Sequence, residues 1–532
     1  MEQRNMLLAF ALSMVVLLGW QALFPAPEGA TQPQAEASQS RAAVVDGSGV
    51  KPPTTSDLTP LSAGDGSASA AAGQKVAADA GSDGVVIARL HNSLLTIGIN
   101  SRGSLIDATL TKYRDSLKDG GQQVRVLQLS TQRAQYLNSG IMGESGPIAF
   151  HLTTSSSDRI VLEAKLGGGR VWQRTLRLKP DSYALEIEDR IRGGAGSRLY
   201  LQAVERYPDK TLNTFYEHAG PIGLLNGKLQ EPDYDDLDEK PVRSAGIGGW
   251  TGIMSRYFLT AIYGDQNGDY RYFYKGDGRA YQAGIILDGV TDGHDALFHS
   301  SVFIGPKSIA LLKTFGVGLE RSVDFGLFAF IAKPMHSFMV WLFDLVHNFG
   351  LCIILLVVLI KIIFYWPSQK SYASMAAMRK IQPEMKRMQE RYSDDRQRLG
   401  EEMMKLYKKH KVNPLSGCLP ILIQIPVFFA LYKVLLMSIE MRQAPFFGWI
   451  TDLSVNDPWF ILPVLMGASM FIQMRLNPQP PDPMQAKVMQ FLPIIFTVMF
   501  LFFPAGLVLY WLVNNVLSIA QQRLVMKQLG VD

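Results

Sequence analysis

The sequence predicts a multi-domain membrane protein, made of a six-span α-helical bundle, an extracytoplasmic antiparallel β-sandwich and a cytoplasmic helical hairpin. Three observations predict this class. Apolar runs gather near the start of the 532-residue chain and in its last part, a region of alternating polarity lies between them, and one loop between two apolar runs is strongly basic. The two cysteines, Cys352 and Cys418, lie in apolar runs, which excludes a disulfide framework and a Cys-based zinc site.

The chain begins with a predicted transmembrane anchor, residues 1–24. The run 6–24 is apolar and long enough to cross a hydrocarbon core of roughly 30 Å at about 1.5 Å per residue. A cleaved signal peptide is the alternative, but an Ala-x-Ala site is missing, and Pro25 and Pro27 crowd the place where cleavage would fall. Residues 25–84 contain no aromatic residue and are mostly small or polar, so they are predicted to be a disordered tether.

Residues 85–323 are predicted to form the β-sandwich. Apolar and polar residues alternate in short runs, as at Leu185 and Ile187 with Glu186 and Glu188. A period of two indicates strands with one buried face. Turn clusters separate these runs and long helical periods are scarce, which favours antiparallel strands. The clusters lie at 120–121, 179–181, 193–194 and 265–268.

The sandwich region carries no catalytic motif. Its acidic stretch, 231–239, lacks the spaced glycine and closing glutamate of a calcium loop, so we interpret it as a solvated loop. A nucleophile motif such as G-x-S-x-G is missing. Two carboxylates in a cleft would suit a glycan-modifying enzyme, and one sequence does not decide whether such a pair meets. We predict no catalytic residue, no metal site and no cofactor.

Residues 324–348 are predicted to form an amphipathic helix on the membrane surface. The polar residues fall within roughly 120° of arc, and aromatic and aliphatic residues occupy the rest. The polar set is Lys333, His336, Ser337, Asp344, His347 and Asn348. Packing on the soluble domain is the alternative. We expect His336 and His347 to be wet interface residues rather than metal ligands.

The rest of the chain contains five further apolar spans. They lie at 349–366, 415–439, 459–474, 488–503 and 505–522, so that residues 413–532 hold spans three to six and a short C-terminal tail. The loop 370–411 carries twelve Lys and Arg against six Asp and Glu. By the positive-inside rule this loop is cytoplasmic, and both termini are then cytoplasmic as well.

The basic segment 367–412 is predicted to be a hairpin of two helices joined at Ser393-Asp394-Asp395. Apolar residues recur at spacings of three and four on both sides of this turn. They are Met378, Ile381, Met385, Met388 and Tyr392, then Leu399, Met403, Leu406 and His410. Pro383 is predicted to start or kink the first helix. The surface charge suits ribosomal RNA or anionic lipid, whereas a purely topogenic loop explains it equally well.

Polar residues within the spans are concentrated in the inner half of the bilayer. Lys361, Gln424, Ser469, Thr497, Asn514 and Ser518 all fall at this depth, and Tyr510, Asn514, Ser518 and Gln521 share one stripe of the last span. In the outer half Lys433 is the exception and is predicted to snorkel outward. Amides and a charge in lipid need partners, so we expect a hydrated recess open to the cytoplasm.

A positive, hydrated recess suits reception of the hydrophilic end of another protein's transmembrane segment. A secondary transporter is a second class, but spans three to six lack an Asp or Glu except Glu440 at an edge. The glycan-modifying enzyme is a third class, and it would need no polar stripe in the membrane. A P-loop is missing, so hydrophobic transfer, membrane potential or a partner would drive the process.

Six stretches closely resemble the YidC family of membrane protein insertases, in its Gram-negative form with a large periplasmic domain. They are Lys411-Val412-Asn413-Pro414-Leu415, Gly417-Cys418-Leu419-Pro420, Gln424-Ile425-Pro426, Arg442-Gln443-Ala444-Pro445-Phe446, Asp482-Pro483-Met484-Gln485 and Phe503-Pro504-Ala505-Gly506-Leu507-Val508-Leu509-Tyr510-Trp511. These stretches are specific in combination. The periplasmic region is similar only in size and strand content.

The resemblance implies an inner-membrane protein that inserts and helps to fold nascent membrane proteins, alone or with the Sec translocon and its accessory subunits. It implies a β-supersandwich, a substrate groove and a hairpin that contacts ribosomes or targeting factors; no DNA partner is implied. The groove cation falls on Lys361, where most members carry Arg, so the planar fork is lost while the charge is kept. The groove residues are Lys361, Gln424, Ser469, Thr497, Tyr510, Trp511, Asn514 and Ser518, and the hairpin contacts are Arg379, Lys380, Lys386, Arg387, Lys405 and Lys408.

Overall fold

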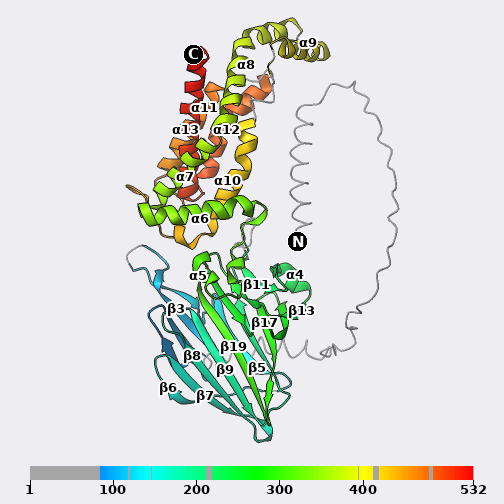
Figure 1. Ribbon diagram of the computed structural model, residues 1–532, viewed down its shortest axis with the longest axis vertical. Helices are drawn as coiled ribbons and strands as arrows, with labels where there is room; N and C mark the ends of the chain where they lie inside the picture. Colours follow the sequence, from blue (N-terminus) through cyan, green and yellow to red (C-terminus); the bar gives the residue numbers. More distant parts are fainter. Residues whose placement is uncertain are drawn as a thin grey trace, which may run out of the picture. The chain divides into compact units, whose positions relative to one another are not determined.

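The computed structural model describes residues 84–117, 120–144, 146–210, 218–392, 395–410, 412, 419–477 and 483–530 (Figure 1). For Arg396, 419–423 and 483–487 the backbone alone is described. The predicted anchor 1–24 and the predicted tether, apart from its last residue, lie outside the described residues. The same holds for Ser393 and Asp394 of the predicted hairpin turn and for 411, 413–418 and 482 of the motif stretches.

The described part of the β domain consists of two antiparallel sheets. The first has the strand order β1-β2-β3-β5-β10-β17-β16-β13, with β4 beside β3. Its strands are β1 Val86–His91, β2 Leu95–Asn100, β3 Leu105–Arg114, β4 Gln123–Leu127, β5 Ala134–Ile141, β10 Arg198–Arg206, β13 Val242–Ile247, β16 Asp269–Gly276 and β17 Ala280–Asp288.

The second sheet has the order β12-β11-β14-β15-β19-β9-β8-β7-β6, with β18 beside β19. Its strands are β6 His151–Ser155, β7 Arg159–Lys165, β8 Val171–Leu178, β9 Ala184–Arg192, β11 Gly220–Leu225, β12 Lys228–Gln230, β14 Trp250–Met254, β15 Phe258–Tyr263, β18 Val290–Asp292 and β19 Asp295–Pro306. Long strands β8, β9 and β19 lie side by side in Figure 1.

The alternation in the sequence sets which face of each strand is buried. In β9, Leu185 and Ile187 are buried between the sheets, whereas Glu188 is exposed. Trp172 and Trp250 are fully buried in the same core. The predicted turn clusters fall between strands, and the predicted antiparallel sandwich is confirmed.

A buried ion pair lies on the core side of the second sheet. The Arg174 guanidinium on β8 donates to both carboxylate oxygens of Asp189 on β9, at 2.7 and 2.9 Å. The same guanidinium donates to the Gly103 carbonyl, in the β2–β3 turn of the first sheet, and to the Ser139 hydroxyl on β5 of that sheet. Trp172 donates its indole N–H to Asp189 at 2.6 Å. This network therefore connects the two sheets.

The acidic stretch is a short helix rather than the solvated loop we expected. Helix α4 spans Tyr234–Glu239, and its Tyr234 and Leu237, three residues apart, are buried against the sheets. Asp235 and Asp236 lie in its first turn, where negative charge is favourable. The Asp238 carboxylate accepts hydrogen bonds from Tyr281 at 2.8 Å and from Lys210 at 3.0 Å. Burial of one apolar face therefore outweighs the polarity of the stretch.

Glu231, next to this helix, provides a pH-dependent test. Burial, and then the nearby Asp324, raises the pKa of Glu231 from 4.5 to about 7, although Lys307 and Lys433 oppose the shift. The folded chain therefore binds a proton more tightly than the unfolded chain, and stability falls as pH rises from about 4.5 to about 7. We expect Glu231→Gln to raise the free energy of unfolding at pH 8 by about 1–2 kcal/mol. This is less than the whole pKa shift would give, because the side chain is partly exposed and solvent screens it.

Thermal unfolding of the full chain in detergent, followed by the β-sheet signal in circular dichroism, measures this effect. At pH 5 the variant and the parent are expected to unfold together, because Glu231 is protonated in the folded parent. Asp235→Asn, on the exposed side of α4, is the matched control. A pH-independent gain for Glu231→Gln would contradict the assignment. The outward direction of Lys433 relative to the membrane stays a prediction.

The helices follow the β domain in the chain. They are α5 Ile309–Lys313, α6 Ala329–Val346, α7 Phe349–Ile363, α8 Tyr365–Arg391, α9 Arg396–Lys409, α10 Leu419–Met437, α11 Ile461–Leu476, α12 Pro483–Phe500 and α13 Ala505–Gln528. Short 3-10 turns are η2 Gly167–Gly169, η4 Leu319–Ser322, η5 Gly326–Phe328 and η7 Ile439–Met441. Helix α13 packs against α7, α8, α10 and α11 and is thus central to the bundle.

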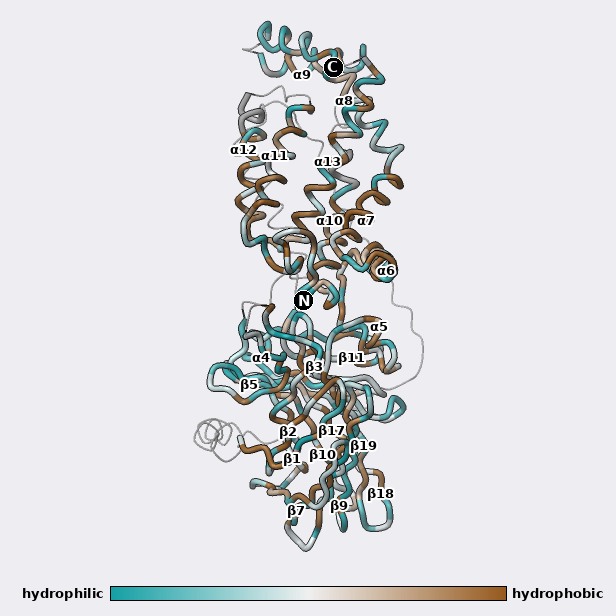
Figure 2. The backbone as a smooth tube through the Cα atoms, turned by 90° about the vertical axis from the view of Figure 1, so that its left-hand side faces the viewer, coloured by the Kyte–Doolittle hydropathy of each residue, from teal (hydrophilic) through white to brown (hydrophobic). Residues whose placement is uncertain are grey.

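Length and composition alone identify fewer spans than the sequence analysis predicts. Among the described residues, Gly326–Val346 is long and apolar enough to cross a membrane, and α7 with α8, bent by 69°, forms a second candidate. Gln424–Met437, Ile461–Leu476 and Val488–Phe500 are shorter apolar helices. Figure 2 shows these helices, which belong to α10, α11 and α12, mainly in the colour of hydrophobic residues. The six-span count stays a prediction.

Helix α6 is the helix predicted to lie on the membrane surface. It packs against α7 and α10 rather than on the face of a sheet, and it runs across their axes in Figure 1. His336 is buried and its ring nitrogen lies 3.7 Å from the Glu440 carboxylate. The expectation that His336 is a wet interface residue is therefore wrong, because α10 and η7 cover this side of the helix. His347 is exposed, as expected.

Helices α8 and α9 pack through the predicted apolar seam. Ile381, Met385, Met403 and Leu406 are buried together in it. His410, just after α9, lies 3.4 Å from Glu384 of α8, so α9 folds back along α8. The prediction that Pro383 starts the first helix is wrong, because α8 begins at Tyr365 and continues through Pro383.

Candidate functional site

The predicted groove cation lies against the polar stripe of α13. The Lys361 ammonium on α7 donates to the Ser518 hydroxyl at 2.7 Å, and Ser518 donates to the Asn514 carbonyl one turn earlier at 2.6 Å. Lys361 is half-buried, whereas Ser518 and Asn514 are buried. Among the described residues, no carboxylate lies within ion-pair distance of Lys361. The charge is therefore held by a neutral partner.

The α10 residue of the prediction joins the same stripe. Gln424 donates its side-chain amide to the Tyr510 hydroxyl, and Tyr510 is buried. Gln521, further along α13, donates to the Tyr365 carbonyl at 3.3 Å. Residues 510, 514, 518 and 521 share one face of α13 and form a polar line along it. Along this face α13 contacts the Lys361 side chain of α7, the Gln424 side chain of α10 and the Tyr365 carbonyl of α8.

A second polar set lies on another face of α13. Asn515 donates to the Ser469 hydroxyl of α11 at 3.0 Å, and Gln522 donates to the Leu476 carbonyl at 3.2 Å. Ser469 was predicted to lie with Lys361, but its hydroxyl accepts from Asn515 and donates to the Met466 carbonyl. Asn515 and Gln522 were not predicted, although their seven-residue spacing marks a second polar face.

Thr497 and Trp511 are also separate from the Lys361 line. The Thr497 hydroxyl donates to the Pro493 carbonyl of its own helix at 2.6 Å. Trp511 contacts the rings of Phe428, Phe496 and Phe500, with centroids 4.8, 6.3 and 5.4 Å away. It thus packs α10, α12 and α13 together. The structure joins Lys361, Gln424, Tyr510, Asn514 and Ser518, and it places Ser469, Thr497 and Trp511 elsewhere.

Gly467 sets how closely α11 approaches α12. A Cβ atom at this position would lie 1.9 Å from the Thr497 hydroxyl oxygen. We expect Gly467→Ala to force the helices apart and to cost about 1–3 kcal/mol of stability. Thermal unfolding of the full chain in detergent measures this loss, and Ala468→Val, on the exposed side of α11, is the control. Thr497→Ala is expected to restore part of the stability of Gly467→Ala; no restoration would contradict the contact.

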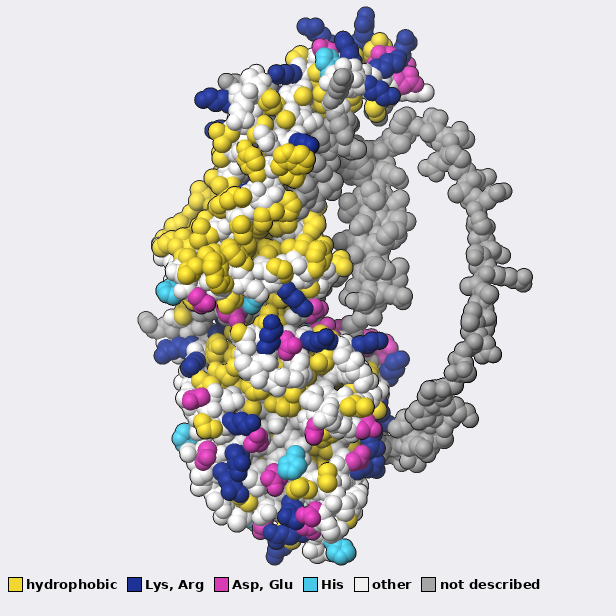
Figure 3. Space-filling view, viewed as in Figure 1, with side chains coloured by type: hydrophobic (Ala, Val, Ile, Leu, Met, Phe, Trp, Pro, Cys, Tyr) yellow, Lys and Arg dark blue, Asp and Glu magenta, His cyan; other side chains and the backbone are white. Residues whose placement is uncertain are grey.

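The predicted hairpin contacts are on the surface of α8 and α9. Lys380, Lys386, Arg387, Lys405 and Lys408 are exposed, and Arg379 is partly so. Figure 3 shows Lys and Arg side chains gathered at the top of the view, where Figure 1 places α8 and α9. Lys405 pairs with Glu402 at 2.7 Å, and Lys380 donates to the Leu529 carbonyl at 3.1 Å. The remaining cations of this set have no acidic partner among the described residues and form a positive surface.

Comparison with known proteins identifies the chain. Residues 88–338 match the YidC periplasmic domain, and residues 341–531 match the 60Kd inner membrane protein family. The membrane protein insertase YidC of Magnetococcus marinus is 42% identical over 451 residues, which cover 80% of this chain and 81% of the relative. That of Nitrosococcus oceani is 36% identical and covers 99% of both chains. The chain belongs to the YidC family of membrane protein insertases.

Family membership shows a membrane protein insertase of the inner membrane with a periplasmic domain, and not an enzyme. Nascent membrane proteins and membrane lipid are therefore its partners. A crystal structure of an active YidC insertase with its first transmembrane domain resolved is 20% identical and covers 85% of this chain and 97% of its own. Its TM-score to this chain is 0.38.

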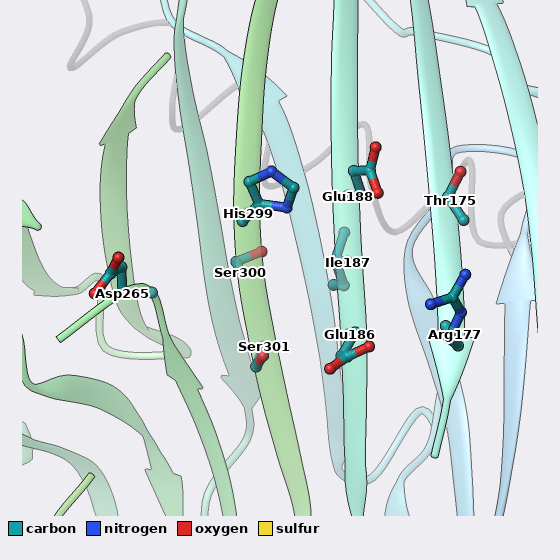
Figure 4. A pocket seen from close by; sticks show the side chains of 10 residues that line it. Thr175, Arg177, Glu186, Ile187, Glu188, Asp265, His299, Ser300 and Ser301 are labelled. Atoms are coloured by element: carbon teal, nitrogen blue, oxygen red, sulfur yellow. The ribbon is translucent and has the colours of Figure 1, made fainter. Parts of the chain in front are cut away.

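The periplasmic domain of this YidC-family insertase carries a polar hollow of about 360 Å³ on the outer face of β8, β9 and β19 (Figure 4). Glu188 stands directly between Thr175 and His299 in the strand register, and Glu186 stands between Arg177 and Ser301. Lys179 neutralises Glu186 at 2.7 Å. Among the described residues, no cluster of His, Cys, Asp or Glu fits a metal ion. The glycan-enzyme alternative is set aside because the chain is an insertase.

Proposed function

We propose that this insertase receives the hydrophilic end of a client transmembrane segment on the polar line formed by Lys361, Ser518, Asn514, Tyr510 and Gln424. One observation carries the proposal. A lysine without a described carboxylate partner is hydrogen-bonded to a buried polar stripe, on helices that are otherwise apolar. An acidic residue of the client would supply the missing countercharge.

The polar line lowers the cost of bringing a hydrophilic segment into the bilayer. A charge at the centre of a lone helix costs about 2.5–3.5 kcal/mol on insertion scales. The buried Asn514 side-chain oxygen has no hydrogen-bond donor among the described residues. Such an atom is costly in a dry site, so water or a client backbone N–H would stabilise it. These features favour a hydrated groove that is open to the cytoplasm and to lipid.

Release follows from the apolar part of the client. Once a hydrophobic segment is near the groove, its transfer into lipid contributes about 25 cal/mol per Å² of apolar surface. Summed over the apolar surface of the segment, this free energy exceeds the attraction of one hydrated ion pair. The client therefore leaves laterally. Large apolar side chains are exposed on the outside of the helices, including Ile362, Phe491, Ile494 and Val498. Figure 3 shows hydrophobic side chains over much of the surface of the helical part. They supply the lipid-facing surface.

This mechanism includes the topology predicted from the sequence. Six spans place both termini and the α8–α9 hairpin in the cytoplasm, and the β domain in the periplasm. Helix α6 lies along the periplasmic surface of the inner membrane. The exposed cations of the hairpin meet ribosomes or targeting factors, and the insertase works alone or beside the Sec translocon. The positive-inside count and the exposed hairpin cations support this arrangement.

A depletion and rescue experiment tests the groove. A Lys361→Ala, Gln424→Ala, Asn514→Ala triple variant, expressed at the normal level, is expected to fail to insert Sec-independent clients. Full rescue would overturn the mechanism. A Ser469→Ala, Thr497→Ala variant is the matched control, since these residues lie away from the Lys361 line. Solvent-accessibility labelling of a cysteine at position 361 is expected to succeed from the cytoplasm and not from the periplasm.

A further inference from the structure

A pocket of about 520 Å³ lies where β12, the α5–η4 segment and α6 meet. Its walls include Leu229 of β12, Lys313 of α5, Arg321 of η4, and Lys333 and Ser337 of α6. We call it the junction pocket. None of its residues belongs to the polar line around Lys361, so the proposed groove does not explain it.

Three cations from three different elements face the junction pocket. Lys313 and Lys333 are exposed, and neither has a hydrogen-bond or ion-pair partner among the described residues. Arg321 donates one guanidinium nitrogen to the Gly227 carbonyl, which fixes the position of its side chain. Two acids, Glu320 and Asp324, also line the pocket. Asp324 accepts a hydrogen bond from the Gly326 backbone N–H. The pocket is therefore positive overall.

Helix α6 presents an apolar strip beside these cations. Phe330, Trp341 and Leu345 are 73%, 56% and 64% exposed. At about 100° per residue they fall within roughly 60° of one another, and Lys333 and Ser337 adjoin them on the polar side. His336 also lines the pocket, and its ring nitrogen lies 3.7 Å from the Glu440 carboxylate. The junction pocket thus sits at a boundary between cations and exposed hydrocarbon.

We propose that the junction pocket binds the phosphate headgroup of an anionic phospholipid, with its acyl chains along the apolar strip of α6. This inference rests on the proposed location of α6 at the membrane surface. Phosphate oxygens accept hydrogen bonds from the Arg321 fork and from the two ammonium groups. A free phosphate matches the cations but gains nothing from Phe330 and Trp341, so the lipid is the better ligand. The bound headgroup would hold the α5–η4 segment against the membrane.

Native mass spectrometry of the full chain in a neutral detergent tests this inference. The parent is expected to retain phosphatidylglycerol in preference to phosphatidylcholine at an ionic strength of about 0.15 M. Lys313→Gln and Lys333→Gln should each lower this preference about fivefold. The double variant should lower it by the product of the two single effects. Lys165→Gln with Lys275→Gln, exposed on the β domain, is the matched control and should keep the parent's preference.

Two outcomes would overturn the inference. One is an unchanged lipid preference in the double pocket variant. The other is inorganic phosphate that binds the parent as tightly as phosphatidylglycerol, because the site would then recognise the free anion.

A spin label at position 341 separates this inference from the proposed function. A label outside the bilayer would refute the location of α6 and this inference with it. A label inside the bilayer, together with a parent chain that shows no lipid preference, would refute only lipid binding at the junction pocket.

Discussion

Lys361→Glu is expected to lower insertion of clients with acidic hydrophilic ends by at least about tenfold, whereas Lys361→Arg should insert them as well as the parent. The reason is the sign of the charge beside Ser518. A glutamate there repels an acidic client, and arginine restores the cation with a planar fork. Proteoliposomes that contain the full chain, with protease protection of a newly synthesised single-span client, measure insertion directly.

A charge-reversed client makes this test specific. When the acidic residues of the client are replaced by lysine, Lys361→Glu is expected to insert it better than the parent does. Lys165→Glu, on the exposed surface of the β domain, should not change insertion of either client. Equal insertion of the acidic client by Lys361→Glu and Lys361→Arg would contradict the electrostatic role of position 361.

The sequence allowed the residues of the Lys361 line to be predicted, but not the contacts that other residues of α13 make with neighbouring helices. Tyr510, Asn514 and Ser518 share a face because of helical geometry alone, so local spacing identifies them. The pairing of Asn515 with Ser469 depends on which helix packs against that face of α13, and no local spacing contains this information. The same holds for Trp511, whose role follows from the rings of α10 and α12 around it.

In the fold, the strands of the β domain and the long helices after it were predictable, whereas strand pairing and the short helix α4 were not. Alternation marks β9 as a strand, but its neighbour β19 lies more than 100 residues later, and nothing local selects it. In the hairpin, the periodic seam was correctly predicted, while Pro383 was given too much weight. A proline inside a helix costs about 3 kcal/mol. Ile381 and Met385 on either side of it are buried in the seam, and this burial offsets the cost.

Asp189→Ala is expected to lower the stability of the β domain by about 3–5 kcal/mol, because it leaves the buried Arg174 guanidinium without its countercharge. The side chains of both residues are at most 2% exposed, so water cannot replace the lost carboxylate. The Trp172 indole N–H loses its acceptor in the same step. Hydrogen exchange of the full chain, read on peptides from β8 and β9, measures the free energy of opening.

The double variant Arg174→Met, Asp189→Leu separates loss of a countercharge from loss of contacts. It removes both buried charges and keeps most of the side-chain volume, so it is expected to lose less stability than Asp189→Ala. Recovery should stay incomplete, because the Gly103 carbonyl and the Trp172 N–H keep no partner from this network. Asp292→Ala removes an exposed ion pair with Arg190 and should not change the exchange of these peptides. A double variant less stable than Asp189→Ala would show that Arg174 stabilises the sandwich mainly through its bonds to the first sheet, and not through Asp189.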